Sequence, residues 1–258
     1  MPLDTASTYG QTLLRTDGRR WNELRRISAS ISTQPSTDGS SQFVMGNTVV
    51  VCNIVGPREG RGQRDTNNAL IETEVTVAPF AQTDRRRRTK GDKRVQELQT
   101  TISSAFQAHL FTHLYPRSSI TISLHVLSLD GALLASCLNA ASLALVDAGV
   151  PMPSILAAVT SGVITSTDGI TPSDPILDLN NSEELELPFL SVGTVSGLSE
   201  HQEDKVSVLI MESRIQIGQN GKKLEAMLAV GVDGCKQVRT IMGEVVRTHG
   251  TRILRGRK

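Results

Sequence analysis

The stretch from residue 132 to residue 148 constrains the fold of this chain more than any other feature. Its sequence, ALLASCLNAASLALVDA, is apolar on nearly every side of a helix, and Gly149 and Pro151 stop it. A helix that is apolar all round is buried in a protein core or in a membrane. Asn139 and Asp147 interrupt the stretch before it reaches membrane-spanning length. We therefore expect a helix enclosed by a protein core, and no membrane partner.

Hydrophobic periodicity predicts the elements of the first half. Gly46-Asn47 is a pair typical of tight hairpin turns, and apolar residues alternate on both sides of it. Apolar residues at steps of three and four predict a helix before Pro116. The first half is thus predicted to contain a hairpin over residues 42 to 55 and a strand over residues 70 to 78. A helix over residues 93 to 114 and a further strand over residues 119 to 129 follow them.

The second half repeats a similar order, so the chain is predicted to have an α+β fold of two similar lobes. Strands are expected over residues 156 to 165, 187 to 195, 205 to 211 and 214 to 217, and a long helix over residues 220 to 248. We expect a loose N-terminal arm over residues 1 to 14 and an N-terminal lobe over residues 15 to 150. A C-terminal lobe over residues 151 to 250 and a solvated basic tail over residues 251 to 258 complete the chain.

Cysteine usage and charge limit the possible functions. Three cysteines, an odd number in apolar surroundings and with no CxxC pair, indicate reduced core residues of an intracellular protein without a zinc site. The first 20 residues hold charged side chains and no apolar core, so we expect no signal peptide. The overall charge is +1, but residues 85 to 94 hold seven Lys/Arg and one Asp, which leaves −5 on the rest. Concentrated positive charge favours a polyanionic partner.

An ordered set of motifs carries a family resemblance. The segments are TDGRRWNELR at residues 16 to 25, GNT at 46 to 48 with Gly56-Pro57 after its strand, VLSLDG at 126 to 131, NAA at 139 to 141, and LALVDAGVP at 143 to 151. Together they resemble ribonuclease PH-like ring subunits of the eukaryotic RNA exosome, the counterparts of the catalytic chain of the archaeal exosome. The resemblance implies the ribonuclease PH-like fold: two βαβα-type lobes, of the ribosomal protein S5 domain 2-like kind, in one compact unit.

The resemblance also implies a phosphate site that this chain has lost. Active members hold phosphate with a Gly-Ser/Thr-Arg stretch at a helix N-terminus after Asp-Gly, where backbone N–H groups and a guanidinium bind the anion. Here Ala132, Leu133 and Leu134 follow Asp130-Gly131. A leucine can neither neutralise phosphate nor donate a hydrogen bond to it. We expect a degenerate phosphate site.

The acidic pair of active members is also altered. Leu177-Asp178-Leu179-Asn180 is kept, but Glu184 and Glu186 fall nearest the two aspartate positions. They are longer by a methylene and closer together in sequence than the family pattern requires. We interpret them as a degenerate acidic site in a solvated loop, and we predict no catalytic residue, metal or cofactor.

The family threads single-stranded RNA past loops that correspond here to Lys93-Arg94 and to Arg61 and Arg64. We expect these residues, with Arg88 from the basic run, to contact RNA phosphates without reading sequence. The run could equally be a solvated tract or a localisation-like signal. His109 and His113 stand one helical turn apart without a third ligand. We interpret them as helix-surface or interface histidines rather than as a metal site.

Three functions remain as alternatives: a non-catalytic ring subunit that conducts RNA, an active phosphate-dependent 3'-5' exoribonuclease, and a free-standing RNA-binding module. Leu134, at the position of the phosphate-binding Arg, favours the first. The resemblance then implies these partners: other ribonuclease PH-like ring subunits, S1/KH cap subunits, an associated 3'-5' exoribonuclease and single-stranded RNA. It implies a location in the nucleus, nucleolus and cytoplasm.

Overall fold

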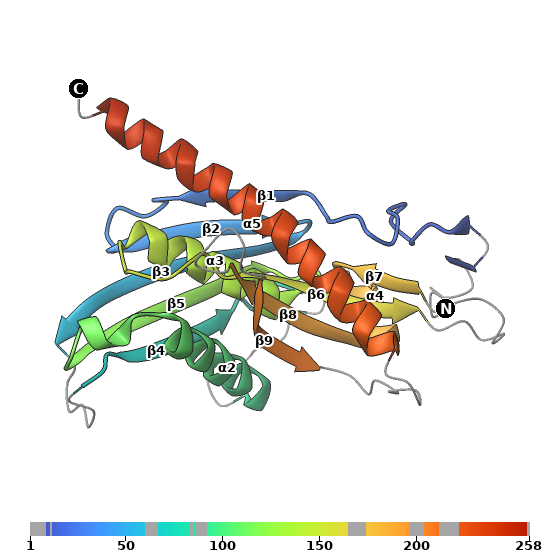
Figure 1. Ribbon diagram of the computed structural model, residues 1–258, viewed down its shortest axis with the longest axis horizontal. Helices are drawn as coiled ribbons and strands as arrows, with labels where there is room; N and C mark the ends of the chain where they lie inside the picture. The colour runs from blue at the N-terminus through green and yellow to red at the C-terminus, as the bar shows by residue number, and fades with distance from the viewer. Residues whose placement is uncertain are drawn as a thin grey trace.

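Two sheets and the helices packed on them make up the protein (Figure 1). The computed structural model describes residues 9–10, 12–59, 67–82, 85, 92–164, 174–196, 204–211 and 222–256. One hydrophobic core contains buried side chains from both halves of the sequence, from Ile31 to Met242. The predicted α+β class with two lobes in one unit is confirmed.

The first sheet has the strand order β1-β2-β3-β5-β4. The strands are β1 (Ile27–Ile31), β2 (Gly39–Met45), β3 (Thr48–Glu59), β4 (Leu70–Val77) and β5 (Ser118–Ser128). The predicted hairpin is β2 and β3, where Met45 lies opposite Thr48 and Gly46 takes a φ of 60°. Neighbours are antiparallel except β4 and β5. Sequence reasoning missed β1.

The second sheet has the order β7-β6-β8-β9. Its strands are β6 (Ala157–Ile164), β7 (Asp174–Leu177), β8 (Phe189–Val195) and β9 (Lys205–Met211). Strands β6, β8 and β9 were predicted, and β7 was not. The strand expected over residues 214 to 217 lies outside the described residues. Every residue of β6 is buried, which makes this strand the centre of the C-terminal lobe.

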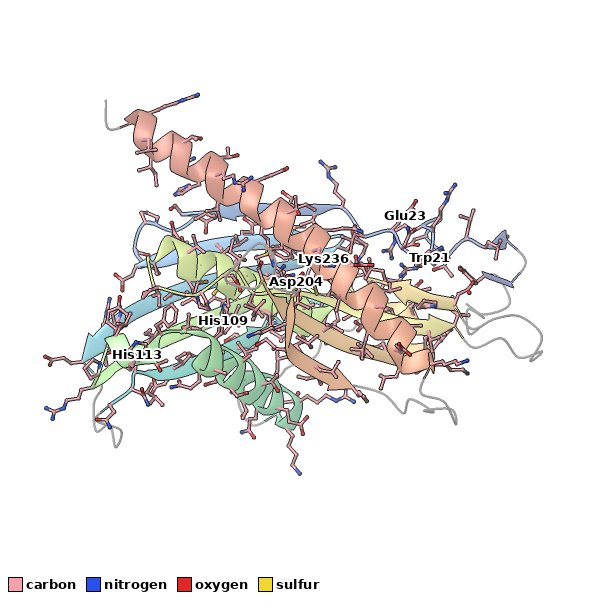
Figure 2. The ribbon with its side chains drawn as sticks, in the orientation of Figure 1. Trp21, Glu23, His109, His113, Asp204 and Lys236 are labelled. Atoms are coloured by element: carbon pink, nitrogen blue, oxygen red, sulfur yellow. The ribbon has the colours of Figure 1, made fainter. Side chains whose placement is uncertain are left out.

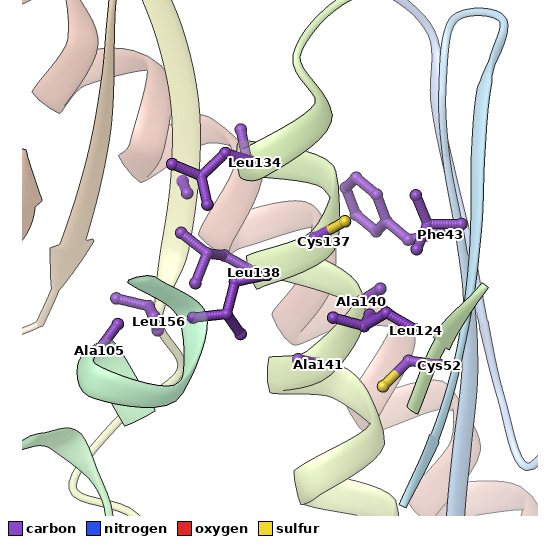
Figure 3. Close-up of a cluster of buried hydrophobic side chains, with 14 of the residues drawn as sticks. Phe43, Cys52, Ala105, Leu124, Leu134, Cys137, Leu138, Ala140, Ala141 and Leu156 are labelled. Carbon is purple, nitrogen blue, oxygen red and sulfur yellow. The ribbon is translucent and has the colours of Figure 1, made fainter. Parts of the chain in front are cut away.

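Helix α3 (Leu133–Asp147) is the enclosed helix that its sequence predicts, with twelve of its fifteen residues buried. Figure 3 shows Leu134 and Leu138 on one side of α3 and Cys137 directed toward Phe43 of β2. The buried amide of Asn139 donates to the carbonyl oxygen of Ala158 (2.9 Å) and accepts from its N–H (2.8 Å). This reciprocal pair satisfies the one amide side chain in α3 and ties the helix to β6 of the other lobe.

Helix α2 (Lys93–His109) ends earlier than expected, which corrects the predicted end before Pro116. Leu110 leaves the helix in an extended conformation, and a separate 3-10 turn, η1, follows at Thr112–Leu114. His109 is buried, and its Nε2 lies 2.7 Å from the carbonyl oxygen of Ser154. Burial lowers the pKa of His109. His113 lies beyond the helix at the outer edge (Figure 2).

Of the two roles expected for the histidines, on the helix surface or at an interface, the surface role is therefore wrong for His109. Its ring is a core group that fastens the end of α2 to the start of the C-terminal lobe.

The three cysteines are free and buried, as predicted for core residues. Burial raises the pKa of the Cys137 thiol to about 12 and that of Cys235 to about 11. These thiols are therefore protonated and inert at neutral pH.

Helix α5 (Lys222–Gly256) packs on the second sheet and on β1, and its C-terminal end reaches beyond the rest of the ribbon (Figure 1). The helix is longer than the predicted residues 220 to 248. Arg252 and Arg255, expected in a tail, are exposed on its last turns, whereas Arg257 and Lys258 lie outside the described residues. No helix in the described part of the chain is both long and apolar enough to cross a bilayer.

Part of the N-terminal arm is docked rather than loose. Tyr9 is buried against Ile176 and Phe189 of the second sheet, and its hydroxyl donates to Asp174 Oδ2 at 3.3 Å. Burial, with the nearby charge of Asp174, raises the pKa of Tyr9 to about 12.

Candidate functional site

The segment that precedes β1 holds the C-terminal lobe through buried arginines. Arg15 Nε donates to Glu183 Oε1 at 2.8 Å, and Arg15 Nη2 forms a second bond to Glu183 Oε2. The same guanidinium donates to the carbonyl oxygens of Leu177 and Asp178, at 2.5 and 2.7 Å. Both charged side chains are fully buried, so the pair is stable because each charge is matched and hydrogen-bonded.

A second buried pair joins Arg25 to Asp178. Arg25 Nη2 donates to Asp178 Oδ1 at 2.7 Å, and the backbone N–H of Arg25 donates to Oδ2 at 2.8 Å. Arg25 Nη1 also donates to the carbonyl oxygen of Asp130, just before α3. Burial alone would lower the pKa of Arg25, but the charge and hydrogen bonds of Asp178 outweigh it and raise the pKa. We call Arg15, Arg25, Asp178 and Glu183 the arginine clasp.

The turn that carries Asp178 approaches the start of α3 closely. Asp178 takes a left-handed φ of 54°, and Leu177 N–H donates to the carbonyl oxygen of Trp21 at 2.8 Å. Gly131 has a φ of 78°, and a Cβ added there would lie 2.7 Å from the carbonyl oxygen of Leu179. Glycine is required at this position because a side chain would clash with backbone. The loop after β7 is thereby pressed against the N-terminus of α3.

Helix α4 (Asn181–Glu186) follows at once and corrects the expectation of a solvated acidic loop. A reciprocal cap begins it: Asn180 Oδ1 accepts from Glu183 N–H at 2.9 Å, and Glu183 Oε2 accepts from Asn180 N–H at 3.0 Å. Glu184 is half-buried, and its Oε1 accepts the backbone N–H of Ala132 at 2.5 Å. Glu186 is exposed at the end of the helix. The structure therefore separates the two glutamates that the sequence pairs.

A cleft of about 620 Å³ opens beside this contact. Leu133, Leu134, Arg94 and Glu184 line it together, so the degenerate phosphate residues, one expected RNA contact and one expected acidic residue share a surface. Most other lining residues are apolar: Val77, Val95, Leu98, Leu129, Leu185, Phe189, Ile210 and Met211. Among the described lining residues Arg94 is the only base. The wall that Leu133 and Leu134 contribute to this cleft is apolar.

The expected RNA contacts are only partly described. Lys93 and Arg94 are exposed in the first turn of α2, where Asp92 accepts the N–H of Arg94 at 3.2 Å. Arg61, Arg64 and Arg88 lie outside the described residues. Cations in the first turn of a helix oppose its dipole. The stability of α2 therefore does not explain why two cations stand in its first turn. Both side chains are exposed and can reach a ligand.

Sequence reasoning missed the arginine clasp. The arginines lie in or beside the motif TDGRRWNELR: Arg25 is its last residue and Arg15 immediately precedes it. The acids lie in or near LDLN, which contains Asp178 and is followed by Glu183. The available signal was the presence of two arginines and two acids in or beside these segments. Nothing local pairs them, because the partners are 168 and 153 positions apart in the chain.

The sequence and the fold of this chain are similar to those of known proteins. A model of the 3' exoribonuclease family, RNase PH domain 1, matches residues 23–151. "Exosome complex component SKI6" of Saccharomyces cerevisiae is 36% identical over 245 residues, covering 93% of each chain. "Exosome complex component RRP41" of Homo sapiens is 33% identical over 239 residues, covering 91% of each.

A solved structure supports the fold. Rice (Oryza sativa) Rrp46 superposes with a TM-score of 0.76 at 23% identity, covering 90% of this chain and 100% of that one. The fold expected from the resemblance is confirmed.

Arg25→Met should destabilise the protein by about 3–5 kcal/mol, because it removes the guanidinium that neutralises the buried Asp178 carboxylate and leaves only Arg19 Nη1, 3.6 Å from Oδ2, as a charged partner. The matched control is Arg26→Met, since Arg26 is exposed and adjacent; it should change the free energy of unfolding by less than about 0.5 kcal/mol. Chemical denaturation of both variants measures the difference. Equal stability of the two variants would show that the clasp does not hold the lobes.

Proposed function

Because this chain belongs to the 3' exoribonuclease (RNase PH) family, we propose that it is a core subunit of an RNA exosome that conducts RNA without cutting it. In this proposal it helps to build a six-membered ring and lines the channel that threads single-stranded RNA to a separate 3'-5' exoribonuclease. The yeast and human relatives are both named exosome complex components, and this chain matches them over nearly their whole length. These similarities support the assignment to this complex.

The observation that carries the non-catalytic role is the state of the α3 N-terminus. Phosphorolysis needs inorganic phosphate bound beside the scissile bond, and a helix N-terminus can bind it through free N–H groups. Here the N–H of Ala132 already donates to the Glu184 carboxylate, and Leu133 and Leu134 form the adjoining wall. A phosphate brought to this place would meet a like charge and no guanidinium on α3, which disfavours binding.

Conduction of RNA rests on the first turn of α2. Lys93 and Arg94 are exposed, and Arg94 borders the cleft, so a strand that passes this turn would meet two cations. Charge of this kind binds the phosphate backbone of any sequence, and its affinity depends on salt. Arg61, Arg64 and Arg88 remain further proposed contacts.

The proposal includes partners and location. Other ribonuclease PH-like subunits would complete the ring, S1/KH cap subunits would cover one face, and a 3'-5' exoribonuclease would receive the RNA. The family resemblance supports this set of partners, and the proposal extends to roles in rRNA processing and mRNA decay and to a location in the nucleus, nucleolus and cytoplasm.

The purified chain, alone and assembled with its ring partners, should release no nucleoside diphosphates from single-stranded RNA in the presence of magnesium and phosphate. The reason is the missing phosphate site at Leu133 and Leu134. Chromatography of the nucleotide products checks this. Steady phosphate-dependent release that a Glu184→Ala, Glu186→Ala double variant abolishes would instead establish the active exoribonuclease.

Reversing the charge of Lys93 and Arg94 to glutamate should weaken RNA passage while the ring stays intact. Each lost phosphate contact should lower the slope of log affinity against log salt by about 0.7 for a single strand. Nuclease protection of a long RNA by the assembled complex, with a salt titration, measures both effects.

Lys236→Glu with Arg247→Glu, an equal charge change at exposed positions on α5, is the control and should leave the slope unchanged. An unaltered protected length and slope in the Lys93, Arg94 variant would exclude these residues from the path.

A further inference from the structure

The N-terminus of α3 is stabilised by a residue from another helix. Its N-cap residue, Ala132, has a left-handed backbone with a φ of 52° and no side chain able to accept a hydrogen bond. Helices usually satisfy their first N–H groups with a Ser, Thr, Asp or Asn at this position. At this helix end the carboxylate of Glu184, a residue 52 positions away, accepts the N–H of the N-cap residue Ala132 itself.

The geometry around Glu184 fixes its carboxylate in place. Glu183, its neighbour, is buried and bound to Arg15, and its reciprocal cap with Asn180 sets the direction of α4. Asn181 N–H donates to Asp130 Oδ1 at 3.3 Å, which attaches the start of α4 to the residue just before Gly131. Glu184 therefore reaches Ala132 from a helix whose first turn is held at several points.

The electrostatics of the contact match those of a bound anion. The N-terminus of a helix carries about half a positive charge, and a carboxylate or a phosphate stabilises it in the same way. A hydrogen bond from a backbone N–H to an ionised carboxylate is also stronger than one to a neutral acceptor. Arg25 adds positive charge nearby, since the charge of Glu184 contributes to raising its pKa.

We propose that Glu184 is an internal anion that takes the place of phosphate at the α3 N-terminus and closes that end of the cleft to phosphate. This inference rests on the proposed non-catalytic function and gives it a mechanism. Leucines at positions 133 and 134 lack the groups that would bind phosphate, and the Glu184 carboxylate adds repulsion and accepts the N–H of Ala132 at the helix end. The N-terminus of α3 is then stable without a bound ligand.

The test is the melting temperature of the full-length chain, in complex with its ring partners, with sodium phosphate or with sodium chloride at equal ionic strength. Wild-type protein should melt at the same temperature in both. Glu184→Ala should lower the melting temperature by about 2–4 °C in chloride, as for the loss of a helix cap in a chain of this size. Tens of millimolar phosphate should restore at least half of that loss.

Glu186→Ala is the matched control, because it removes an exposed glutamate from the same helix. It should show neither the loss nor the response to phosphate. If Glu184→Ala melts like Glu186→Ala, or if phosphate restores no more than chloride does, the inference is wrong. A wild-type protein that phosphate stabilises would also overturn it.

If Glu184→Ala does not fold in chloride, Glu184→Gln and Glu186→Gln decide the question. Glutamine keeps an acceptor oxygen and removes only the charge, so Glu184→Gln should melt below Glu186→Gln, and equal melting temperatures would contradict the inference. These assays contain no RNA. If phosphate does not restore the melting temperature of Glu184→Ala, and the wild type releases no nucleotides in the separate RNA assay, only this inference is refuted. If the wild type releases nucleotides in that RNA assay, the proposed function is refuted.

Discussion

The buried pairing of Arg15 with Glu183 and of Arg25 with Asp178 is the interaction on which the rest of the site depends. Burying four charges is costly unless each is matched, and here each guanidinium and carboxylate is held by several hydrogen bonds. The clasp connects the start of the N-terminal lobe to the loop after β7. That loop sets the position of α4, and α4 places the Glu184 carboxylate on the N–H of Ala132, the N-cap residue of α3.

Hydrophobic periodicity was sufficient to predict the large elements. The enclosed helix α3, the β2–β3 hairpin and strand β6 all follow from local patterns of apolar residues. The short elements β7 and α4, of four and six residues, carry too little pattern to predict, and they hold the site. Helix α2 ends at His109, where the chain turns extended and the ring contacts a carbonyl of the other lobe, a contact that no local signal reveals.

The structure adds to the predicted site a geometry that the residue types did not reveal. Residue types alone indicated that Leu133 and Leu134 cannot bind phosphate. They could not show that Glu184 turns toward Ala132 while Glu186 is exposed, because that difference depends on a helix, on which two residue steps change the direction of a side chain by about 200°. The result is a family fold that keeps its cleft and its helix terminus but provides an acid and leucines where an anion would bind. In the proposed function, RNA contact is left to exposed cations such as Lys93 and Arg94.

The most direct test of a conducting, non-cutting subunit is to map where RNA touches it. A long single-stranded RNA containing 4-thiouridine would be bound to the assembled ring, irradiated, and the crosslinked peptides identified by mass spectrometry. The account predicts crosslinks in the first turn of α2, at or next to Lys93 and Arg94, and none in the peptides that contain Ala132 to Leu134 or Glu184. An RNA 3' end crosslinked to the α3 N-terminus or to α4 would contradict it, because RNA would then enter the cleft as a substrate.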